Sequence, residues 1–210
     1  MSQLLKTIIL GGGGHGRDVF GLLSRQQNLS IIAILDDNWK DKERFLGCPA
    51  LLLEGIQKHL DSGDHYALGI GYPLIRRRIL DSIADCELTP IPTATHPSSV
   101  VSEHAKLGIG CTIFELSSVS PNVNIGDHCS ISQHVTIGHD TVLEENVCVF
   151  PGASISGNVR VGKDTMIGTN ATILQHVSIG ENVKIGAGSL IIKDVPDGAT
   201  MTAAPAQLRQ

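Results

Sequence analysis

Apolar residues are distributed differently in the two halves of this chain. In the first half, short continuous apolar runs alternate with segments whose apolar residues have helical spacing. The runs predict buried strands at residues 7–10, 31–35 and 66–71, and the helical spacing predicts helices at 18–26 and 74–85. Strands that alternate with helices indicate a small parallel α/β sheet.

From residue 101 the pattern becomes a strict repeat of six residues. A large aliphatic residue begins each repeat, and a small or β-branched residue follows it four positions later. The aliphatic positions are Val101, Leu107, Ile113, Val119, Ile125, Ile131, Ile137, Leu143, Val149, Ile155, Val161, Ile167, Ile173, Ile179, Ile185 and Ile191. Neither the period of an α-helix nor that of a strand produces this spacing. It is typical of a parallel β-helix, in which each repeat contributes one short strand and a turn.

A coil of three such strands would stack residues that lie eighteen positions apart in the sequence. Ile137 would then lie between Val119 and Ile155, and Cys111 would lie under Cys129. We expect these two cysteines to be small buried residues in one column of the core.

The segment 88–99, which contains three prolines, separates the two patterns. We therefore expect an α/β domain over residues 1–95 and a β-helix domain over residues 96–210. A chain of 210 residues can bury one large core or two small ones. The low aromatic content (3%) and the 23 glycines favour a fold packed from small, regular layers.

The charge distribution argues against nucleic acid as a partner, because the net charge is −5 and no basic tract is present. The densest basic run is Arg76, Arg77 and Arg78, which we expect to form a solvated helix face. Glu144 and Glu145 are expected to lie in a solvated turn.

Membrane and disulfide signals are also missing from the sequence. No apolar stretch approaches the roughly 20 residues that span a bilayer, and the first residues resemble a strand rather than a secretory signal. The five cysteines contain no CxxC pair, which argues against a disulfide framework or a zinc site. We therefore expect a cytoplasmic protein without a membrane span.

A glycine-rich turn follows the first predicted strand. Gly11, Gly13 and Gly16 fit the GxGxxG pattern, and Asp36 falls twenty residues later. In dinucleotide-binding folds such glycines let the backbone approach a pyrophosphate, and the acid binds a ribose hydroxyl. The second mononucleotide-binding half is missing here, so a nucleotide-sugar fits better than NAD. The alternative is a tight strand-to-helix turn that merely tolerates glycine.

The two halves together resemble a known family. The residues that carry the resemblance are the glycine run 11–16, the pair Asp36 and Asp37, the segment 96–99, the pair His139 and Asp140, and Pro205 with Ala206. They are similar to those of bacterial hexapeptide-repeat sugar acyltransferases of the PglD/NeuD type, which N-acetylate nucleotide-activated amino sugars or O-acetylate sialic acids. The resemblance covers nearly the whole chain. It implies a left-handed β-helix, a homotrimer, and active sites in the clefts between neighbouring helices.

His139 and Asp140 are the candidate catalytic pair. Acetyl transfer from a thioester needs a base, a role that suits histidine, and a neighbouring carboxylate can hold the ring and stabilise its protonated form. In the family, a histidine–acid pair in this turn has that role. The alternative is a solvated corner turn, but the stacked position beyond His139 is Gly157, which should open space for a ligand beside the imidazole. For His128 and His134 we expect surface turn positions at different corners rather than metal ligands.

The resemblance also implies two sets of binding residues. The nucleotide-sugar pocket would be lined by Gly13, Gly14, His15, Asp36 and Asp37, with Gly71 at its edge. Acetyl-CoA would lie in the groove between two helices, against Cys148, Gly157, Thr169 and Ala187. Cys148 departs from several relatives, which have a histidine there, and a thiol is a weaker hydrogen-bond partner. The end of the chain departs too, because Ala204 and Gln207 replace a usual glycine and lysine.

These expectations combine into an acetyl-CoA-dependent N-acetyltransferase acting on the amine of a nucleotide-activated amino sugar. Transfer would be direct, with His139 as general base assisted by Asp140, an oxyanion donor near Gly157, and no metal. The first alternative is O-acetylation of sialic acid or another sugar hydroxyl. The others are a trimeric sugar-binding or scaffold protein without catalysis, and an NAD-dependent enzyme.

Overall fold

A six-stranded sheet with strand order β3-β4-β2-β1-β5-β6 forms the centre of the N-terminal domain. The structure is a computed structural model, and it describes residues 4–37, 44–52, 56 and 64–204. The strands are β1 (Leu5–Leu10), β2 (Leu29–Leu35), β3 (Arg44–Phe45), β4 (Cys48–Leu51), β5 (His65–Leu68) and β6 (Thr89–Pro90). Adjacent strands are parallel except for the β3–β4 pair. The predicted α/β domain is confirmed.

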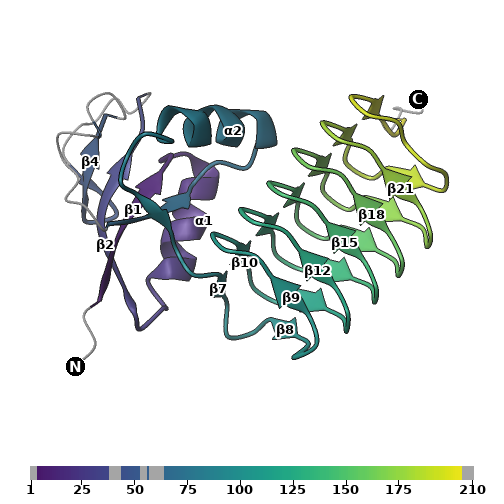
Figure 1. Cartoon of the computed structure of the whole chain (residues 1–210), viewed down its shortest axis with the longest axis horizontal. Coiled ribbons are helices and arrows are strands. Elements are labelled where there is room, and N and C mark those ends of the chain that lie inside the picture. Colours follow the sequence, from purple (N-terminus) through teal and green to yellow (C-terminus); the bar gives the residue numbers. More distant parts are fainter. Residues whose placement is uncertain (1–3, 38–43, 53–55, 57–63, 205–210) are drawn as a thin grey trace, which may run out of the picture.

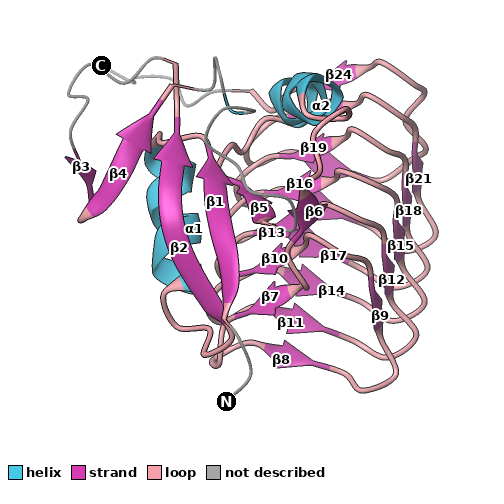
Figure 2. Cartoon of the chain, turned by 60° about the vertical axis from the view of Figure 1, so that its left-hand side comes forward, coloured by secondary structure: helices cyan, strands magenta, loops and turns pink. Residues whose placement is uncertain are grey.

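Two helices cover opposite faces of this sheet. They are α1 (Gly14–Leu23) and α2 (Pro73–Ser82). Val19 and Leu22 of α1 pack with Ile9, whereas Ile79 of α2 packs with Ile8 on the other face. Figure 1 shows α1 on the side of the sheet that faces the β-helix, and Figure 2 shows the strands of the sheet in front of α1. Helix α1 begins four residues earlier than expected, because glycines carry no side chain that could register in a hydrophobic pattern.

The second domain is a left-handed parallel β-helix, as expected. Figure 1 shows its coils stacked beside the α/β domain. The first face carries β7 (Ala94–Thr95), β10 (Thr112–Ile113), β13 (Ser130–Ile131), β16 (Cys148–Val149), β19 (Met166–Ile167), β22 (Lys184–Ile185) and β24 (Thr200–Met201). The second face carries β8 (Val100–Val101), β11 (Ser118–Val119), β14 (Thr136–Ile137), β17 (Ser154–Ile155), β20 (Thr172–Ile173) and β23 (Leu190–Ile191). The third face carries β9 (Lys106–Leu107), β12 (Asn124–Ile125), β15 (Val142–Leu143), β18 (Arg160–Val161) and β21 (Ser178–Ile179).

The stacking register agrees with the repeat. Ile137 pairs with Val119 on one side and with Ile155 on the other. The aliphatic positions point inward and form one continuous core, which includes Cys111 and Cys129. After Ile191 the period breaks, because β24 pairs with β22 at an offset of sixteen residues instead of eighteen.

Three corners connect the faces, and we name each by one residue. The Thr169 corner joins the first face to the second, the His139 corner joins the second to the third, and the Asn146 corner joins the third to the first. The third residue after most aliphatic positions has a positive φ, for example 60° at Asn122 and 59° at Asp140. Asn, Asp, His and Gly tolerate this left-handed conformation best, which explains their recurrence there.

The α/β domain docks on the β-helix through a buried arginine. Arg76 of α2 is 1% exposed, and its guanidinium donates hydrogen bonds to the carbonyl oxygens of Ile70 (2.8 Å) and His128, and to Oδ1 of Asn146 (2.8 Å). Asn146 in turn donates to the carbonyl oxygen of Pro73 (2.9 Å). Hydrogen bonds therefore join α2 and the loop before it to the Asn146 corner.

Two expectations about this region are wrong. Arg76 and Arg77 do not form a solvated face, since Arg76 is buried and Arg77 pairs with Glu145 (2.9 Å) and Asp164 (3.0 Å) across the domain boundary. Glu145 does lie in an exposed turn, with its side chain 43% exposed, and is paired there with Arg77. His128 is half-buried, with its ring stacked on Tyr66 at 5.9 Å, and is not a surface residue. A pattern of charges along the sequence cannot indicate which helix face another domain will cover.

Each described helix has ten residues, and neither is long and apolar enough to cross a membrane.

Candidate active site

His139 and Asp140 form a hydrogen-bonded pair at the surface of the His139 corner. Nδ1 of His139 lies 2.7 Å from Oδ2 of Asp140, and the two side chains are 56% and 46% exposed. Asn122, one coil earlier, donates from Nδ2 to Oδ1 of Asp140 at 3.2 Å. The hydrogen bonds from His139 and then Asn122 lower the pKa of Asp140. An ionised Asp140 accepts the Nδ1 proton of His139, which leaves the lone pair on Nε2 available to a substrate.

Gly157 lies directly against this imidazole. A Cβ added at Gly157 would lie 2.6 Å from Nε2 of His139 and 2.7 Å from Cε1. The backbone N–H of Asn158 donates to the carbonyl oxygen of His139 at 2.8 Å, which fixes the two coils at this point. The space that we expected for a ligand at Gly157 is therefore taken by the histidine ring itself. The missing side chain still matters, because it lets the ring lie against the next coil.

The glycines of the N-terminal turn divide into two classes. Gly11 has a φ of 109°, and a Cβ at Gly16 would collide with the carbonyl oxygen of Gly11, so both are required by the packing of α1 against the turn. Gly13 and Gly14 are exposed, and an added Cβ would meet no atom within 4 Å. Gly13 caps α1 without a side-chain hydrogen bond. An open helix N-terminus of this kind suits an anionic group such as a diphosphate.

The two acidic residues after β2 lie beside this turn. Oδ2 of Asp36 accepts a hydrogen bond from the backbone N–H of Gly12 at 2.8 Å. Asp37 is exposed. The structure therefore brings Asp36 next to the glycine turn, as the dinucleotide-type motif requires.

His15 and Gly71 meet at the boundary between the domains. His15 lies in the first turn of α1, with its ring 5.5 Å from that of Phe114 and its Nε2 3.3 Å from Oγ of Ser130. Burial, and secondarily the positive charge of Arg76, lowers the pKa of His15 to about 4. The ring is therefore neutral near pH 7. A Cβ at Gly71 would lie 3.8 Å from Cγ of His15, so these two predicted pocket residues are neighbours.

The residues expected to contact acetyl-CoA occupy three places in one chain. Cys148 lies on the first face, is 2% exposed, and pairs with Ser130 and Met166 in the neighbouring strands. Burial raises the pKa of its thiol, which reduces its reactivity. Thr169 and Ala187 lie one above the other at the Thr169 corner, whereas Gly157 lies at the His139 corner. No single groove of one chain joins all of them. Pro205, Ala206 and Gln207 lie outside the described residues.

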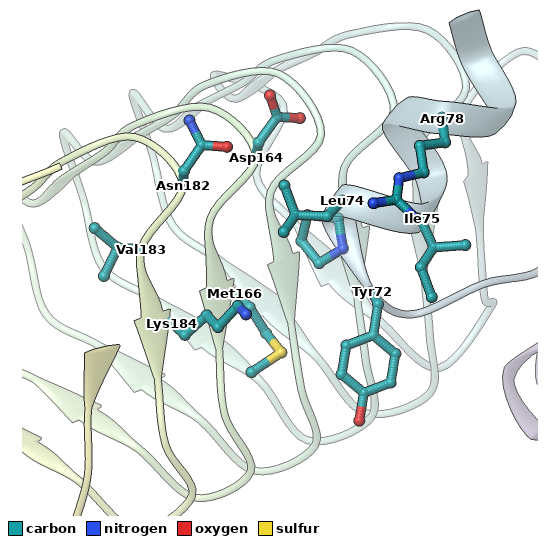
Figure 3. Close-up of a pocket in the computed structure, with 10 residues that line it drawn as sticks. Tyr72, Leu74, Ile75, Arg78, Asp164, Met166, Asn182, Val183 and Lys184 are labelled. Carbon is teal, nitrogen blue, oxygen red and sulfur yellow. The ribbon is translucent and has the colours of Figure 1, made fainter. Parts of the chain in front are cut away.

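A cavity of about 260 Å³ lies between the start of α2 and strands β19 and β22 (Figure 3). Tyr72, Leu74 and Met166 contribute to its walls, and Lys184 reaches it from β22. The cavity is smaller than the ~300–1,000 Å³ of ordinary small-molecule sites. It contains none of the predicted site residues.

Sequence reasoning missed Asn122, although a signal for it existed. It stands eighteen residues before Asp140 and therefore directly below that residue in the stack. Among the residues that the structure describes, no group of three or more His, Cys, Asp and Glu side chains is placed to hold a metal ion.

Comparisons with known proteins match both domains. Residues 6–83 match the PglD N-terminal domain, and residues 140–175 and 159–193 match the bacterial transferase hexapeptide (six repeats). UDP-N-acetylbacillosamine N-acetyltransferase of Bacillus subtilis (strain 168) is 29% identical over 109 residues, which are 50% of this chain and 49% of that protein. The chain thus spans about half the length of this curated relative.

Solved structures match over nearly the full length. The acetyltransferase domain of PglB from Neisseria gonorrhoeae FA1090 is 30% identical, with a TM-score of 0.86 over 93% of this chain and 95% of that one, and has also been solved in complex with acetyl coenzyme A. A histidine-to-asparagine variant of perosamine N-acetyltransferase from Caulobacter crescentus, in complex with CoA and GDP-perosamine, is 26% identical. Its TM-score is 0.86, over 98% of this chain and 97% of that one. The chain therefore belongs to the bacterial hexapeptide-repeat sugar acyltransferases of the PglD/NeuD-like family.

Proposed function

We propose that this protein is an acetyl-CoA-dependent N-acetyltransferase that acts on the amine of a nucleotide-activated amino sugar. The observation that carries the proposal is the surface pair of His139 and Asp140, joined at 2.7 Å with Nε2 of the imidazole left to receive a proton. The solved relatives that hold acetyl coenzyme A, or CoA with GDP-perosamine, support the choice of both substrates.

The reaction would proceed by direct transfer. The amine nitrogen of the sugar attacks the carbonyl carbon of the thioester and forms the new C–N bond, while its proton passes to Nε2 of His139. Asp140 stabilises the resulting imidazolium. The tetrahedral intermediate then collapses, the C–S bond breaks, and the CoA sulfur leaves with a proton returned from His139. A base in this position contributes roughly 10²–10⁴-fold to the rate. A backbone N–H near Gly157 would stabilise the oxyanion.

The nucleotide-sugar would bind at the glycine turn of α1. The open N-terminus at Gly13 and Gly14 would receive the diphosphate, and Asp36 and Asp37 would bind the nucleoside. His15, neutral and held at Ser130, would contact the sugar from the side of the β-helix. Because the α/β domain would bind the nucleotide part of the substrate, a nucleotide-activated amino sugar is favoured over free sialic acid.

The active site would need two chains, and we propose a homotrimer. The glycine turn lies on the side of the first face, whereas His139 lies on the opposite edge of the β-helix, so one chain cannot bring both to the same amine. The second face, which adjoins the His139 corner, is free of charge along its outward positions, as interface cores tend to be. These positions are Val100, Ser118, Thr136, Ser154, Thr172 and Leu190.

We further propose that the protein works in the cytoplasm. All five cysteines are free thiols, which fits a reducing compartment.

The test is thiol release from acetyl-CoA by the purified protein. The substrates are UDP-, GDP- and dTDP-linked amino sugars together with free and CMP-linked sialic acids. His139→Ala is compared with His104→Ala, a matched change of another exposed histidine. We expect turnover on one nucleotide-linked amino sugar and a loss of at least a hundredfold in His139→Ala alone.

The other outcomes separate the alternatives. Turnover on a sialic acid would move the assignment to O-acetylation. Turnover that survives in His139→Ala would remove His139 as the base. Ligand binding without any turnover would indicate a binding or scaffold protein, and stabilisation by NADH but not by a nucleotide sugar would indicate an NAD enzyme.

A further inference from the structure

Asn122 and Asp140 form a vertical pair at the His139 corner. Both residues occupy the left-handed position of their turns, with φ values of 60° and 59°. One coil separates them, so the amide of Asn122 points along the helix axis to the carboxylate of Asp140, with Nδ2 3.2 Å from Oδ1.

The two oxygens of the Asp140 carboxylate thereby have different partners. Oδ1 accepts from Asn122, and Oδ2 lies 2.7 Å from Nδ1 of His139. The terminal torsion of an aspartate is broad, and the side chain of Asp140 is 46% exposed, so packing does not fix the plane of the carboxylate. Two hydrogen bonds on opposite oxygens do fix it.

A similar asparagine–carboxylate stack, in which both partners share one oxygen of the carboxylate, occurs at a second place in the fold. At the Asn146 corner, Nδ2 of Asn146 donates to Oδ1 of Asp164 across one coil at 2.7 Å. That carboxylate receives Arg77 at 3.0 Å and helps to hold α2 on the β-helix. In both cases an asparagine supports a carboxylate eighteen residues later, and the carboxylate holds a cationic or proton-donating partner.

We propose that Asn122 is a positioning residue of the active site, which anchors Asp140 so that Oδ2 holds the Nδ1 proton of His139. The consequence is a single tautomer whose Nε2 lone pair faces the substrate. This inference rests on the proposed function, because it acts through His139 as the base. Asparagine at a left-handed turn position has a conformational explanation as well, so the test must keep the backbone and remove only the amide.

Asn122→Gly meets this requirement, because glycine accepts a positive φ without strain. Asn182→Gly is the matched control, since Asn182 is exposed and has a φ of 55° but lies at the Asn146 corner. We expect kcat of Asn122→Gly to fall about tenfold, as loosened orientation of a catalytic group predicts. KM for both substrates should stay within about twofold, because the amide does not bind them. Asn182→Gly should match the wild type.

The pH profile of Asn122→Asp gives a readout that a merely structural role would not move. The new carboxylic acid can donate to Oδ1 only when it is protonated. The ratio of its kcat to that of the wild type should therefore rise as the pH is lowered. The titratable groups of this corner are Glu103, His104, Lys106, His139, Asp140, Arg160 and His176, and both enzymes share them, so the ratio reports the new carboxyl group together with its charge effect on these neighbours.

A measurement without substrate completes the test. Long-range ¹H–¹⁵N correlation spectra report which ring nitrogen of His139 carries the proton. We expect the Nδ1–H tautomer to dominate in the wild type and in Asn182→Gly, and to lose population in Asn122→Gly.

The outcomes separate this inference from the proposed function. If His139→Ala is inactive but Asn122→Gly keeps the wild-type kcat and tautomer, Asn122 has no positioning role and the proposed function stands. If His139→Ala is fully active, the base is another group, and Asn122 is not a positioning residue of the active site. If no substrate turns over, an unchanged tautomer in Asn122→Gly overturns the inference by itself.

Discussion

Gly157→Ala should displace His139, the proposed base, without unfolding the protein. The added methyl group would lie 2.6 Å from Nε2, 2.7 Å from Cε1 and 3.0 Å from Cδ2 of His139. Non-bonded heavy atoms prefer about 3.5–4.0 Å, so the ring and the methyl group must separate by about 1 Å. The ring is the part that moves, because it is the exposed end of a flexible side chain, whereas Gly157 is fixed in the stack of coils.

The size of the effect follows from that displacement. A misplacement of about 1 Å can cost about a hundredfold in rate, and the base as a whole contributes roughly 10²–10⁴-fold. We therefore expect kcat of Gly157→Ala to fall by about a hundredfold. The unfolding free energy should change by less than about 1 kcal/mol, because the backbone of Gly157 is not left-handed and the clash is relieved at the surface.

Gly138→Ala is the matched control in the same corner. Its added Cβ would lie 2.5 Å from the backbone nitrogen of Gly157 and 2.6 Å from the carbonyl carbon of Ser156. These backbone atoms cannot swing away, so we expect a loss of roughly 1–3 kcal/mol of stability. Thermal unfolding, measured on both variants, should thus show a loss of stability in Gly138→Ala alone, whereas thiol release from acetyl-CoA should show that Gly157→Ala loses activity at nearly unchanged stability.

A double-mutant cycle tests whether the loss of activity in Gly157→Ala is caused by displacement of the His139 imidazole. On a His139→Ala background, Gly157→Ala should cause no further loss of activity, because the group that it displaces is gone. A full additional loss there would mean that Gly157 acts on the acyl donor instead. A wild-type kcat in the single Gly157→Ala variant would refute the argument that the ring must lie against this coil.

Four further predictions concern other parts of the molecule. Arg76→Met should lower the unfolding free energy by about 2–4 kcal/mol in denaturant titrations, since it leaves buried acceptor oxygens without a hydrogen-bond donor. Arg78→Met, at an exposed position, should change the unfolding free energy by under about 0.5 kcal/mol. Gly13→Ala should lower the melting temperature by only a few degrees, as loss of a glycine N-cap predicts, but raise KM for the nucleotide sugar several-fold, because its methyl group would enter the open N-terminus of α1; an unchanged KM would place the sugar elsewhere. The lowered pKa of Asp140 keeps its carboxylate ionised as the pH falls through the ordinary aspartate value, so its ¹³C titration midpoint should lie below that value. Cys148 should resist iodoacetamide in the native protein and react after unfolding, as mass spectrometry would show.

The repeat made most of the β-helix predictable. A spacing of six fixes which residues point inward, and three strands per coil fix which residues stack. The pairing of Ile137 with Ile155 and the position of Gly157 against His139 both follow from that arithmetic. Helix α1 begins earlier than its hydrophobic pattern indicates, because its first turn includes Gly14 and Gly16, which have no side chain to contribute to such a pattern.

Contacts between the domains could not be predicted in this way. Arg76 belongs to a run of three arginines that resembles an ordinary solvated helix face, yet it is buried at the Asn146 corner. These contacts depend on the shapes of the two domain surfaces, one of which is assembled from coils far apart in the sequence. The contact between Asn122 and Asp140 could have been predicted in principle, because the two residues are one coil apart in the sequence. However, nothing in the sequence distinguishes one turn asparagine from another until its partner is known.

Local sequence therefore sets the conformation of each turn, whereas the docking of the α/β domain determines which turns are covered and which stay exposed. His128, His134 and Asp140 all occupy the left-handed position of their turns, with φ values of 58°, 58° and 59°. The α/β domain covers the first of these turns with Tyr66, leaves His134 exposed, and lies on the face opposite Asp140. The corner that carries the candidate base is thus the corner farthest from the glycine turn of the same chain. Under the proposed function, that separation is what makes a neighbouring chain a structural part of each active site.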